Sequence, residues 1–445
     1  MTPTIQAACR RALRALLAPF LLAAALLATT AAPSLAAHRA RLSADLADHL
    51  AAGSQSIDVI VHGNAATVDA IASRYNLAVK KRLKSGAVLR INAGQLDALQ
   101  QDDQLDHLSG DIRLRGSMAI TNQAIGADQV WAGVGDVPSL TGNGVTVAVI
   151  DSGIDTRHRA LRSRVLASVD FTGGTGQDTY GHGTHVAGII AGRPGRTAET
   201  RKLQGVADEA SLVNLRVLGD DGSGSASDVI EAIDWAIEHR TQFRIGVINL
   251  SLGAPVLQPY RDDPLCEAVE RAVASGIVVV AAAGNFGKTE DGRIVFGGIT
   301  SPANSPYAVT VGAIDTHGTP ERSDDTVATY SSRGPTAYDL IIKPDIVAPG
   351  SHIVSAEAAG SYLSRTYPER HVIGRGTNGY MQLSGTSMSS AVVSGTMALL
   401  RQESSSLAPA EAKTVVQMAS SFLPSADLLA GGRSEEHTSE LQSQR

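Results

Sequence analysis

Short runs dominated by apolar residues recur between residues 145 and 311, and stretches with helical periodicity separate them. Each run has about the length of one strand, and none alternates strictly between apolar and polar residues over its whole length. Strands covered on both faces have this pattern, so it predicts a mostly parallel sheet. The runs span residues 145–150, 212–218, 246–250, 277–281 and 308–311.

The stretches between these runs place apolar residues at helical spacing. Residues 228–238 put Val229, Ile233 and Ala236 on one face, and Ser227 precedes them as the expected N-cap. Helices on both faces of a parallel sheet form a three-layer α/β/α architecture, which we predict for residues 117–432. The other predicted helices span residues 184–191, 264–274 and 387–400.

Residues 37–116 have a different pattern and begin with a strand at 57–61 that alternates apolar and polar residues. The expected order of elements is β-α-β-β-α-β, the ferredoxin-like order of a small α+β domain. After the first strand come a helix at 65–75, strands at 78–84 and 87–91, a helix at 96–108 and a strand at 112–115.

The N-terminus combines a basic segment, which ends at Arg14, with an apolar stretch over residues 15–27 and small residues up to Ala36. This combination is typical of a secretory signal peptide, which we assign to residues 1–36. A membrane anchor is the alternative, but the apolar stretch is short of the roughly 20 residues that span a bilayer. We therefore predict a secreted or periplasmic protein whose mature form carries no membrane segment.

Three motifs carry polar side chains at the ends or starts of predicted elements. Asp151 ends the first apolar run, His182 lies between two glycines before a helix, and Ser387 lies at a small-residue turn into another helix. A serine hydroxyl becomes a nucleophile when an imidazole takes its proton and a carboxylate orients that imidazole. Taken alone, Ser387 also fits an ordinary capping serine in a turn.

The order Asp151, His182, Ser387 and the residues around them resemble the subtilisin-like serine peptidase family over about residues 125–419. The resemblance implies that His182 is the general base, that Asp151 orients it, and that Ser387 attacks the peptide bond. It also implies that Asn285 completes the oxyanion hole with the Ser387 N–H. The expected activity is that of a serine endopeptidase, which needs no cofactor for its chemistry.

The same resemblance suggests where a substrate chain would bind. Two segments, 249–253 and 218–225, resemble the family's opposing rims of the cleft, and their glycines allow another backbone to approach closely. None of the expected substrate-binding residues is charged, so we predict a preference for uncharged or apolar side chains before the cleaved bond. These residues are Gly222, Gly224, Ser251, Leu252, Gly253, Ala282, Ala283, Gly284 and Thr300.

Residues 37–116 resemble the propeptides of the family, which assist folding and inhibit the enzyme until it cleaves itself. We expect the cut between Arg115 and Asn122. The alternative is a permanent N-terminal domain without an inhibitory role.

Composition narrows the choice of partners. The formal net charge of −6 gives no reason to expect nucleic acid, and we expect a monomer that binds polypeptide substrates and its own propeptide. Cys9 would leave with the signal peptide, so Cys266 remains alone and is expected to pack in the core. No spacing of ligands predicts a metal site, although structural calcium stays open.

Residues 433–445 resemble the translation of a common sequencing adapter, which predicts a truncated gene; a genuine polar tail is the alternative. Two alternatives to the peptidase also remain. One is a catalytically silent relative that binds peptides in the same cleft. The other is an acid-active peptidase of similar fold that uses Glu and Asp in place of His, which the Gly181-His182-Gly183 motif disfavours.

Overall fold

The computed structural model describes residues 39–432 except 43, 52, 84–85, 111–116, 134, 136–137 and 425. The predicted signal peptide, the strand expected at 112–115 and the tail after residue 432 therefore lie outside the described residues. The chain divides into two compact units, Met1–Arg113 and Leu114–Arg445.

The larger unit is built on an eight-stranded sheet with the order β12-β11-β10-β9-β6-β8-β7, in which β13 also pairs with β11. Every pair is parallel except β11 with β12, so the prediction of a mostly parallel sheet is confirmed. The strands are β6 (Thr146–Asp151), β7 (Val165–Asp170), β8 (Ser211–Arg216), β9 (Ile245–Leu250), β10 (Val278–Ala282), β11 (Val309–Asp315), β12 (Thr326–Val327) and β13 (Ile346–Pro349).

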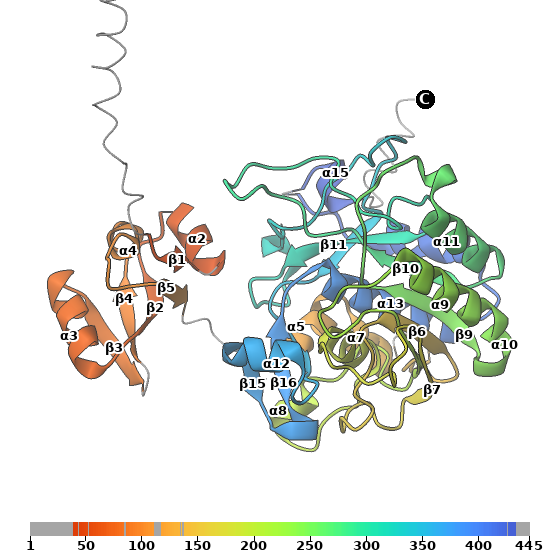
Figure 1. Cartoon of the computed structure of the whole chain (residues 1–445), viewed down its shortest axis with the longest axis horizontal. Coiled ribbons are helices and arrows are strands. Elements are labelled where there is room, and N and C mark those ends of the chain that lie inside the picture. Colours follow the sequence, from red (N-terminus) through yellow and green to blue (C-terminus); the bar gives the residue numbers. More distant parts are fainter. Residues whose placement is uncertain are drawn as a thin grey trace, which may run out of the picture. The chain divides into compact units, whose positions relative to one another are not determined.

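Alternate residues of the central strands enter two separate hydrophobic cores. Val147 and Val149 of β6 pack with the helices α7 (His182–Ala191) and α13 (Thr386–Glu403). Their neighbours Ala148 and Ile150 pack with α9 (Ala226–Glu238) and α11 (Pro264–Ala274) on the other face. The helices thus cover both faces of the sheet (Figure 1), and the predicted three-layer α/β/α architecture is confirmed.

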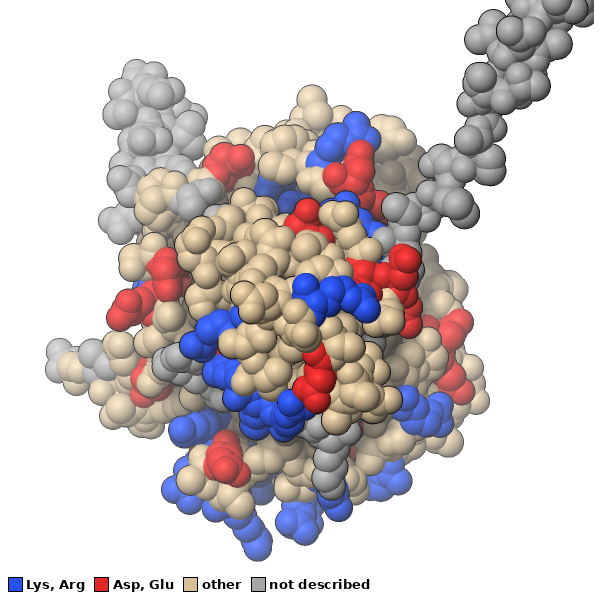
Figure 2. Space-filling model, turned by 90° about the vertical axis from the view of Figure 1, so that its left-hand side faces the viewer, with Lys and Arg blue, Asp and Glu red and all other residues tan. Residues whose placement is uncertain are grey.

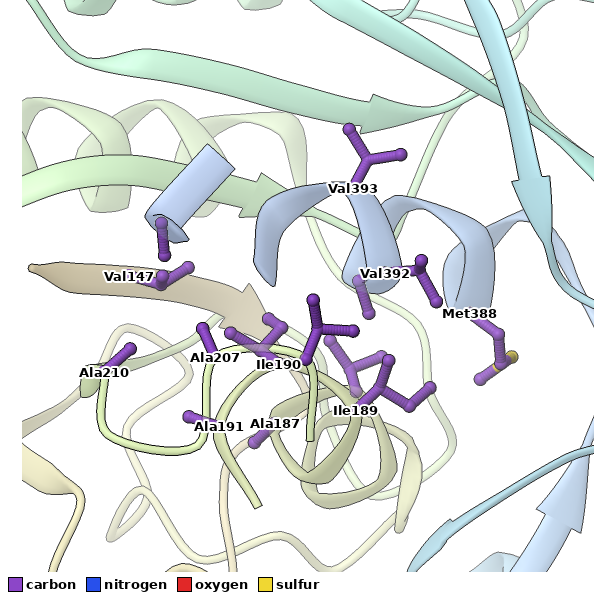
Figure 3. Close-up of a cluster of buried hydrophobic side chains, with 14 of the residues drawn as sticks. Val147, Ala187, Ile189, Ile190, Ala191, Ala207, Ala210, Met388, Val392 and Val393 are labelled. Carbon is purple, nitrogen blue, oxygen red and sulfur yellow. The ribbon is translucent and has the colours of Figure 1, made fainter. Parts of the chain in front are cut away.

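Figure 3 shows the first of these cores at the level of the side chains. Ile189 and Ile190 of α7 lie in one buried cluster with Met388 and Val392 of α13 and with Val147 of the sheet. Burial of such side chains stabilises a fold by about 1.5–3 kcal/mol each. The two helices that carry His182 and Ser387 are therefore fixed to each other and to β6.

Two helix starts differ from the sequence prediction. Ser225, not Ser227, caps α9, because its side chain accepts a hydrogen bond from the N–H of Asp228. Helix α7 begins at His182 instead of Thr184, so the imidazole belongs to its first turn.

The strands β7, β12 and β13 and the remaining elements of the larger unit were not predicted. They include a three-stranded antiparallel sheet of β14 (Ile353–Ala356), β16 (Tyr380–Leu383) and β15 (His371–Ile373). The other helices are α5 (Ser117–Ala124), α6 (Ala127–Ala132), α8 (Ala198–Arg201), α10 (Arg240–Phe243), α12 (Tyr362–Thr366), α14 (Pro409–Ala419) and α15 (Leu428–Gly431).

The smaller unit has a hydrophobic core of its own and a five-stranded sheet with the order β1-β5-β2-β4-β3. Its elements from β2 to β5 follow the order β-α-β-β-α-β, preceded by an additional strand and helix. They are β1 (Arg41–Leu42), α2 (Ala44–Ala51), β2 (Ile57–His62), α3 (Ala65–Arg74), β3 (Ala78–Leu83), β4 (Gly86–Ile91), α4 (Ala93–Gln100) and β5 (His107–Gly110).

The helix predicted at 96–108 was wrong in its bounds. Asn92 caps α4 and forms a reciprocal capping box with Gln95, so the helix starts at Ala93. It ends at Gln100, and β5 occupies residues 107–110.

The surface carries charges of both signs, and Figure 2 shows acidic as well as basic side chains on the visible face. Within the described ranges, no helix combines the length and the apolar character that a membrane crossing requires.

Gly188 in α7 provides a test of the packing between this helix and β14. A Cβ at this position would lie 2.3 Å from Ser355 Oγ and 2.9 Å from Ala356 Cβ. We expect Gly188→Ala to lower the free energy of unfolding by about 1–3 kcal/mol, because overpacking outweighs the gain in helix propensity. Thermal unfolding measures this, with Glu231→Ala on the exposed face of α9 as the control; an unfolding midpoint equal to that of the control would contradict it.

Candidate active site

The site lies at the carboxyl edge of the sheet, at β6, where the order in which the chain adds strands to the sheet reverses. Its neighbours β8 and β9 lie on opposite sides of it, and ligands of open α/β sheets bind at such a reversal. Asp151 is the last residue of β6 and is fully buried. Ser251 and Ala283 directly follow β9 and β10 at the same edge.

A short hydrogen bond joins the carboxylate of Asp151 to the imidazole of His182. The Nδ1 atom of His182 lies 2.8 Å from Asp151 Oδ1 and 3.0 Å from Oδ2. An ionised carboxylate only accepts hydrogen bonds, so Nδ1 carries the proton and Nε2 is left free to accept one. The side chain of His182 is 17% exposed, which leaves the imidazole accessible at the edge of the sheet.

Opposing effects act on the pKa of His182. Burial lowers it, but the charge of Asp151, the hydrogen bond to Asp151 and the charge of Asp178 raise it. The net result is a pKa above the ordinary value for histidine. Below that pKa the imidazole is protonated and cannot act as a base.

The buried carboxylate of Asp178 organises the turn that presents His182, and the sequence analysis missed it. It accepts hydrogen bonds from the N–H of Gly181 at 2.6 Å and from the N–H and Oγ1 of Thr184 at 2.8 and 2.6 Å. It thus satisfies free N–H groups at the start of α7. Burial raises its pKa to about 6 against the effect of these hydrogen bonds, so the group is charged above that pH.

Asp178 is also connected to the loop that follows Asp151. Its Oδ1 atom accepts from the hydroxyl of Ser152 at 2.9 Å, and this hydroxyl accepts from the N–H of Gly183 at 2.9 Å. The N–H of Ser152 donates to Asp151 at 2.7 Å. One connected network therefore fixes the carboxylate and the imidazole relative to each other. An acidic residue four positions before His182 was the only signal in the sequence.

Ser387 occupies the first turn of α13, and its side chain is half-buried. Its hydroxyl donates to the carbonyl oxygen of Ser251 at 3.2 Å. In return, the hydroxyl of Ser251 donates to the carbonyl of Ser387 at 2.9 Å. The residue after β9 thus anchors the start of α13. The backbone N–H of Ser387 has no hydrogen-bond acceptor within the part of the chain that the structure describes.

The orientation of the Asn285 amide follows from its neighbours. Its Oδ1 atom accepts from the N–H of Thr386 at 3.0 Å and from the hydroxyl of Thr386 at 3.1 Å. A backbone N–H only donates, so this atom is the oxygen, and the amide Nδ2 remains as a donor. A Cβ on Gly385 would lie 3.5 Å from Nδ2, which shows that the amide lies against the turn before Ser387.

The expected substrate-binding residues after β9 and β10 pack against each other. A Cβ on Gly253 would lie 2.4 Å from Thr300 Oγ1, and one on Gly284 would lie 2.8 Å from Thr300 Cγ2. Thr300 is buried and its N–H donates to the carbonyl of Ala283 at 3.1 Å. Leu252 is half-buried, whereas Ala282 and Ser251 are buried.

The other rim is a tight turn in which Leu218 pairs with Gly224. Gly222 has a φ of +79°, and a Cβ there would lie 2.5 Å from the ring of Tyr180. Tyr180 in turn stacks on Tyr362 of α12 with ring centroids 5.6 Å apart. The rim is thus supported by aromatic side chains beside His182.

Arg216, at the end of β8, connects this rim to the loop before His182 and was also missed. It is nearly buried and donates to Asp220 at 2.7 Å, to Asp170 at 3.2 Å and to Thr179 at 3.2 Å. Burial would raise the pKa of Asp170, but hydrogen bonds from Thr172 and the loop backbone lower it to about 2. A charged residue inside a predicted apolar run was the available signal.

The remaining candidate nucleophiles and bases are structural. His185 is buried, bonds the carbonyl oxygens of Ile353 and Met381, and has a pKa that burial lowers to about 3. His158 is buried against the carbonyl of Gly379 at 2.8 Å. Burial raises the pKa of Cys266 to about 12, as expected for a thiol in the core. In the described ranges, no group of three or more His, Cys, Asp or Glu side chains is arranged to hold a metal ion.

This chain belongs to the subtilase family, whose model matches residues 142–440. The matched range runs past residue 432 into the tail, which the structure does not describe, and the origin of the tail stays a prediction. The chain is 38% identical over 286 residues to Serine protease AprX of Bacillus subtilis (strain 168), which covers 63% of this chain and 62% of AprX.

Other relatives align over more of their own length. The chain is 36% identical to Subtilisin DY of Bacillus licheniformis over 62% of this chain and 81% of that protein. Among solved structures, Sphericase matches with a TM-score of 0.54 and 30% identity, over 69% of this chain and 95% of its own. The chain thus spans less than two thirds of the length of AprX.

Substitution of Asp178 tests the network around the start of α7. We expect Asp178→Asn to lower the free energy of unfolding by about 1–3 kcal/mol, because an amide offers one acceptor atom where the carboxylate offers two. The midpoint of thermal unfolding measures this loss of stability. Both proteins carry Ser387→Ala, so that they cannot digest themselves during the measurement.

Asp221→Asn is the matched control, since the exposed Asp221 accepts from Ser223 through one oxygen that an amide retains. Equal unfolding midpoints of the two variants would mean that the Asp178 network contributes nothing specific.

Proposed function

We propose that the protein is a serine endopeptidase that hydrolyses peptide bonds through an acyl-enzyme. One observation carries the proposal: Asp151 holds the Nδ1–H of His182, at the sheet edge where Ser387 begins α13. Asp151, His182 and Ser387 are the proposed catalytic residues, and Asn285 is the proposed oxyanion donor. Membership of the subtilase family supports this assignment.

In the proposed reaction, Nε2 of His182 takes the proton of the Ser387 hydroxyl as that oxygen attacks the substrate carbonyl. Asp151 keeps the imidazole in the tautomer with the proton on Nδ1 and stabilises the imidazolium that forms. The Ser387 hydroxyl first has to turn away from the carbonyl of Ser251, to which it now donates. His182 then returns the proton to the leaving amine.

The tetrahedral intermediate carries a negative oxygen that needs donors already in place. The free N–H of Ser387 and the Nδ2 of Asn285 are the proposed pair. Thr386 fixes the amide of Asn285, so little reorganisation is needed when the charge develops. A helix N-terminus adds a favourable partial positive charge at the same place.

We further propose that an extended peptide binds between residues 251–253 and the rim at 222–224. The proposed pocket for the side chain before the cleaved bond is formed by Gly253, Gly284 and Thr300 with their neighbours. No charged side chain belongs to this set, which supports a preference for uncharged or apolar residues over Lys or Arg.

The smaller unit is proposed to be an inhibitory propeptide of an exported precursor. Its separate core supports independent folding, and residues 111–116 connect it to the larger unit. The proposed cut falls near Arg115, because Met118, Thr121 and Asn122 are buried in the larger unit. Export by residues 1–36 remains a proposal from the sequence.

Replacing the proposed nucleophile tests activity and processing together. We expect Ser387→Ala to lower kcat by about 10⁶, the loss known for this step in subtilisin, and to leave the N-terminal unit attached. Cleavage of fluorogenic peptides with Leu or Lys before the bond measures activity and preference, and N-terminal sequencing locates the cut.

The control for this experiment is Ser227→Ala on α9, which should behave as the unaltered chain. A silent peptide-binding relative would cleave neither peptide and would not react with a serine-directed phosphonate. Processing of the Ser387→Ala chain at the same rate as the unaltered chain would rule out self-cleavage.

The pKa of His182 predicts the pH dependence. Because neutral imidazole is the base, kcat/KM should rise with pH through the pKa of His182, whose midpoint should lie above the ordinary value of about 6.5. In Asp151→Asn the midpoint should move down and kcat should fall by about 10⁴. Asp228→Asn, in the first turn of α9, is the control. A rate optimum in strong acid would instead favour the peptidase that uses carboxyl groups.

A further inference from the structure

A cavity of about 510 Å³ opens at the edge of the sheet opposite to the proposed active site. It lies where β6 and β9 begin, since Val145, Ile245 and Gly246 line it. The last turn of α13 and the short helix α10 complete its wall. Its size falls in the range of about 300–1,000 Å³ that is usual for ligand sites.

The charged side chains that line this cavity are all basic. They are Arg240, Arg244 and Arg401, and no Asp or Glu lies among the lining residues. Within the residues that the structure describes, no ion pair joins any of these arginines to a carboxylate. Three cationic side chains thus line one cavity without a carboxylate among its lining residues, an arrangement that favours the binding of an anion.

Arg401 is the innermost of the three, with only 7% of its surface exposed. Its Nη1 donates to the carbonyl oxygen of Leu407, which anchors one side of the guanidinium. Burial lowers the pKa of Arg401, and the charge of Arg240 lowers it further, so the two guanidinium groups lie close enough to repel. An anion between them would relieve this repulsion.

The surrounding groups hold the cavity in shape and add donors. A Cβ on Gly276 would lie 2.9 Å from Nη2 of Arg240, so this arginine packs against backbone. Gln402 accepts from the N–H of Thr141 at 2.8 Å and of Gly142 at 2.6 Å through Oε1. Its amide Nε2 therefore remains as a donor at the cavity wall.

We propose that this cavity binds a small phosphate-type oxyanion, such as inorganic phosphate or pyrophosphate. The guanidinium fork matches the oxygen spacing of phosphate and donates two parallel hydrogen bonds. The three arginines line one cavity, whereas the chain as a whole carries a net charge of −6, so the basic cluster is a local feature of an acidic chain. A phosphate attached to a larger molecule offers the same chemistry.

The test uses the full chain with Ser387→Ala, which keeps the protein intact whether or not it is a peptidase. Isothermal titration with phosphate and with pyrophosphate is carried out at constant ionic strength, so that general screening does not change. We expect Arg240→Gln and Arg244→Gln each to weaken binding by about tenfold or more, as the loss of one charge-assisted pair implies.

Arg162→Gln is the matched control, because Arg162 is exposed and lies outside the cavity. Unchanged binding in the control together with weaker binding in the cavity variants supports the proposal. Equal weakening in all three variants, or no binding to the unaltered cavity, overturns it. If a dicarboxylate such as malonate binds more tightly than phosphate, the proposal is also overturned.

Two further measurements test the role of the Arg401 guanidinium and the source of the bound phosphate group. Arg401→Lys keeps the positive charge but removes the paired guanidinium donors, so it should weaken phosphate binding. The unfolding midpoint of this variant without ligand shows whether its fold is intact. A phosphoserine peptide that binds more tightly than free phosphate would identify the source as a larger molecule. Binding of phosphate but not of the peptide would identify a small free anion.

Discussion

The hydrogen bond between a fully buried carboxylate and an imidazole in the first turn of a helix is the constraint on which the rest of the larger unit depends. Burying Asp151 is unfavourable unless its oxygens find donors, and His182 and the N–H of Ser152 provide them. The N–H of Ser152 is adjacent in the chain, but the imidazole comes from a different segment and reaches the carboxylate only because α7 starts beside the end of β6. The tight packing of Gly183 against Asp151, where a Cβ would lie 3.1 Å away, permits that approach.

The sequence was most informative where the physical pattern was strongest. Runs such as 246–250 are buried on both faces, and the structure has β9 at Ile245–Leu250. The helix at 264–274 was correct to the residue, because Asp263 caps it and Pro264 begins it. Short elements such as β12 and β15 have too few residues to form a period, and their positions depend on partners far away in the chain.

In the site, too, some residues could be predicted from the sequence and others could not. The order and surroundings of Asp151, His182 and Ser387 are visible in the sequence, because glycines and small residues mark each turn. The roles of Asp178 and Arg216 are not, because a single charged residue in a loop or at a strand end has no pattern of its own. Their importance comes from burial and from the number of hydrogen bonds they make, which only the folded chain reveals.

Helix α13 runs for 18 residues, which corresponds to about 27 Å, and thus extends from one edge of the sheet to the other. Ser387 lies at its beginning and Arg401 in its last turn, with closely packed side chains along the length between them. Such a rod cannot slide at one end alone. Because one helix connects the two edges of the sheet, the packing around Arg401 contributes to the position of the Ser387 hydroxyl at the other edge.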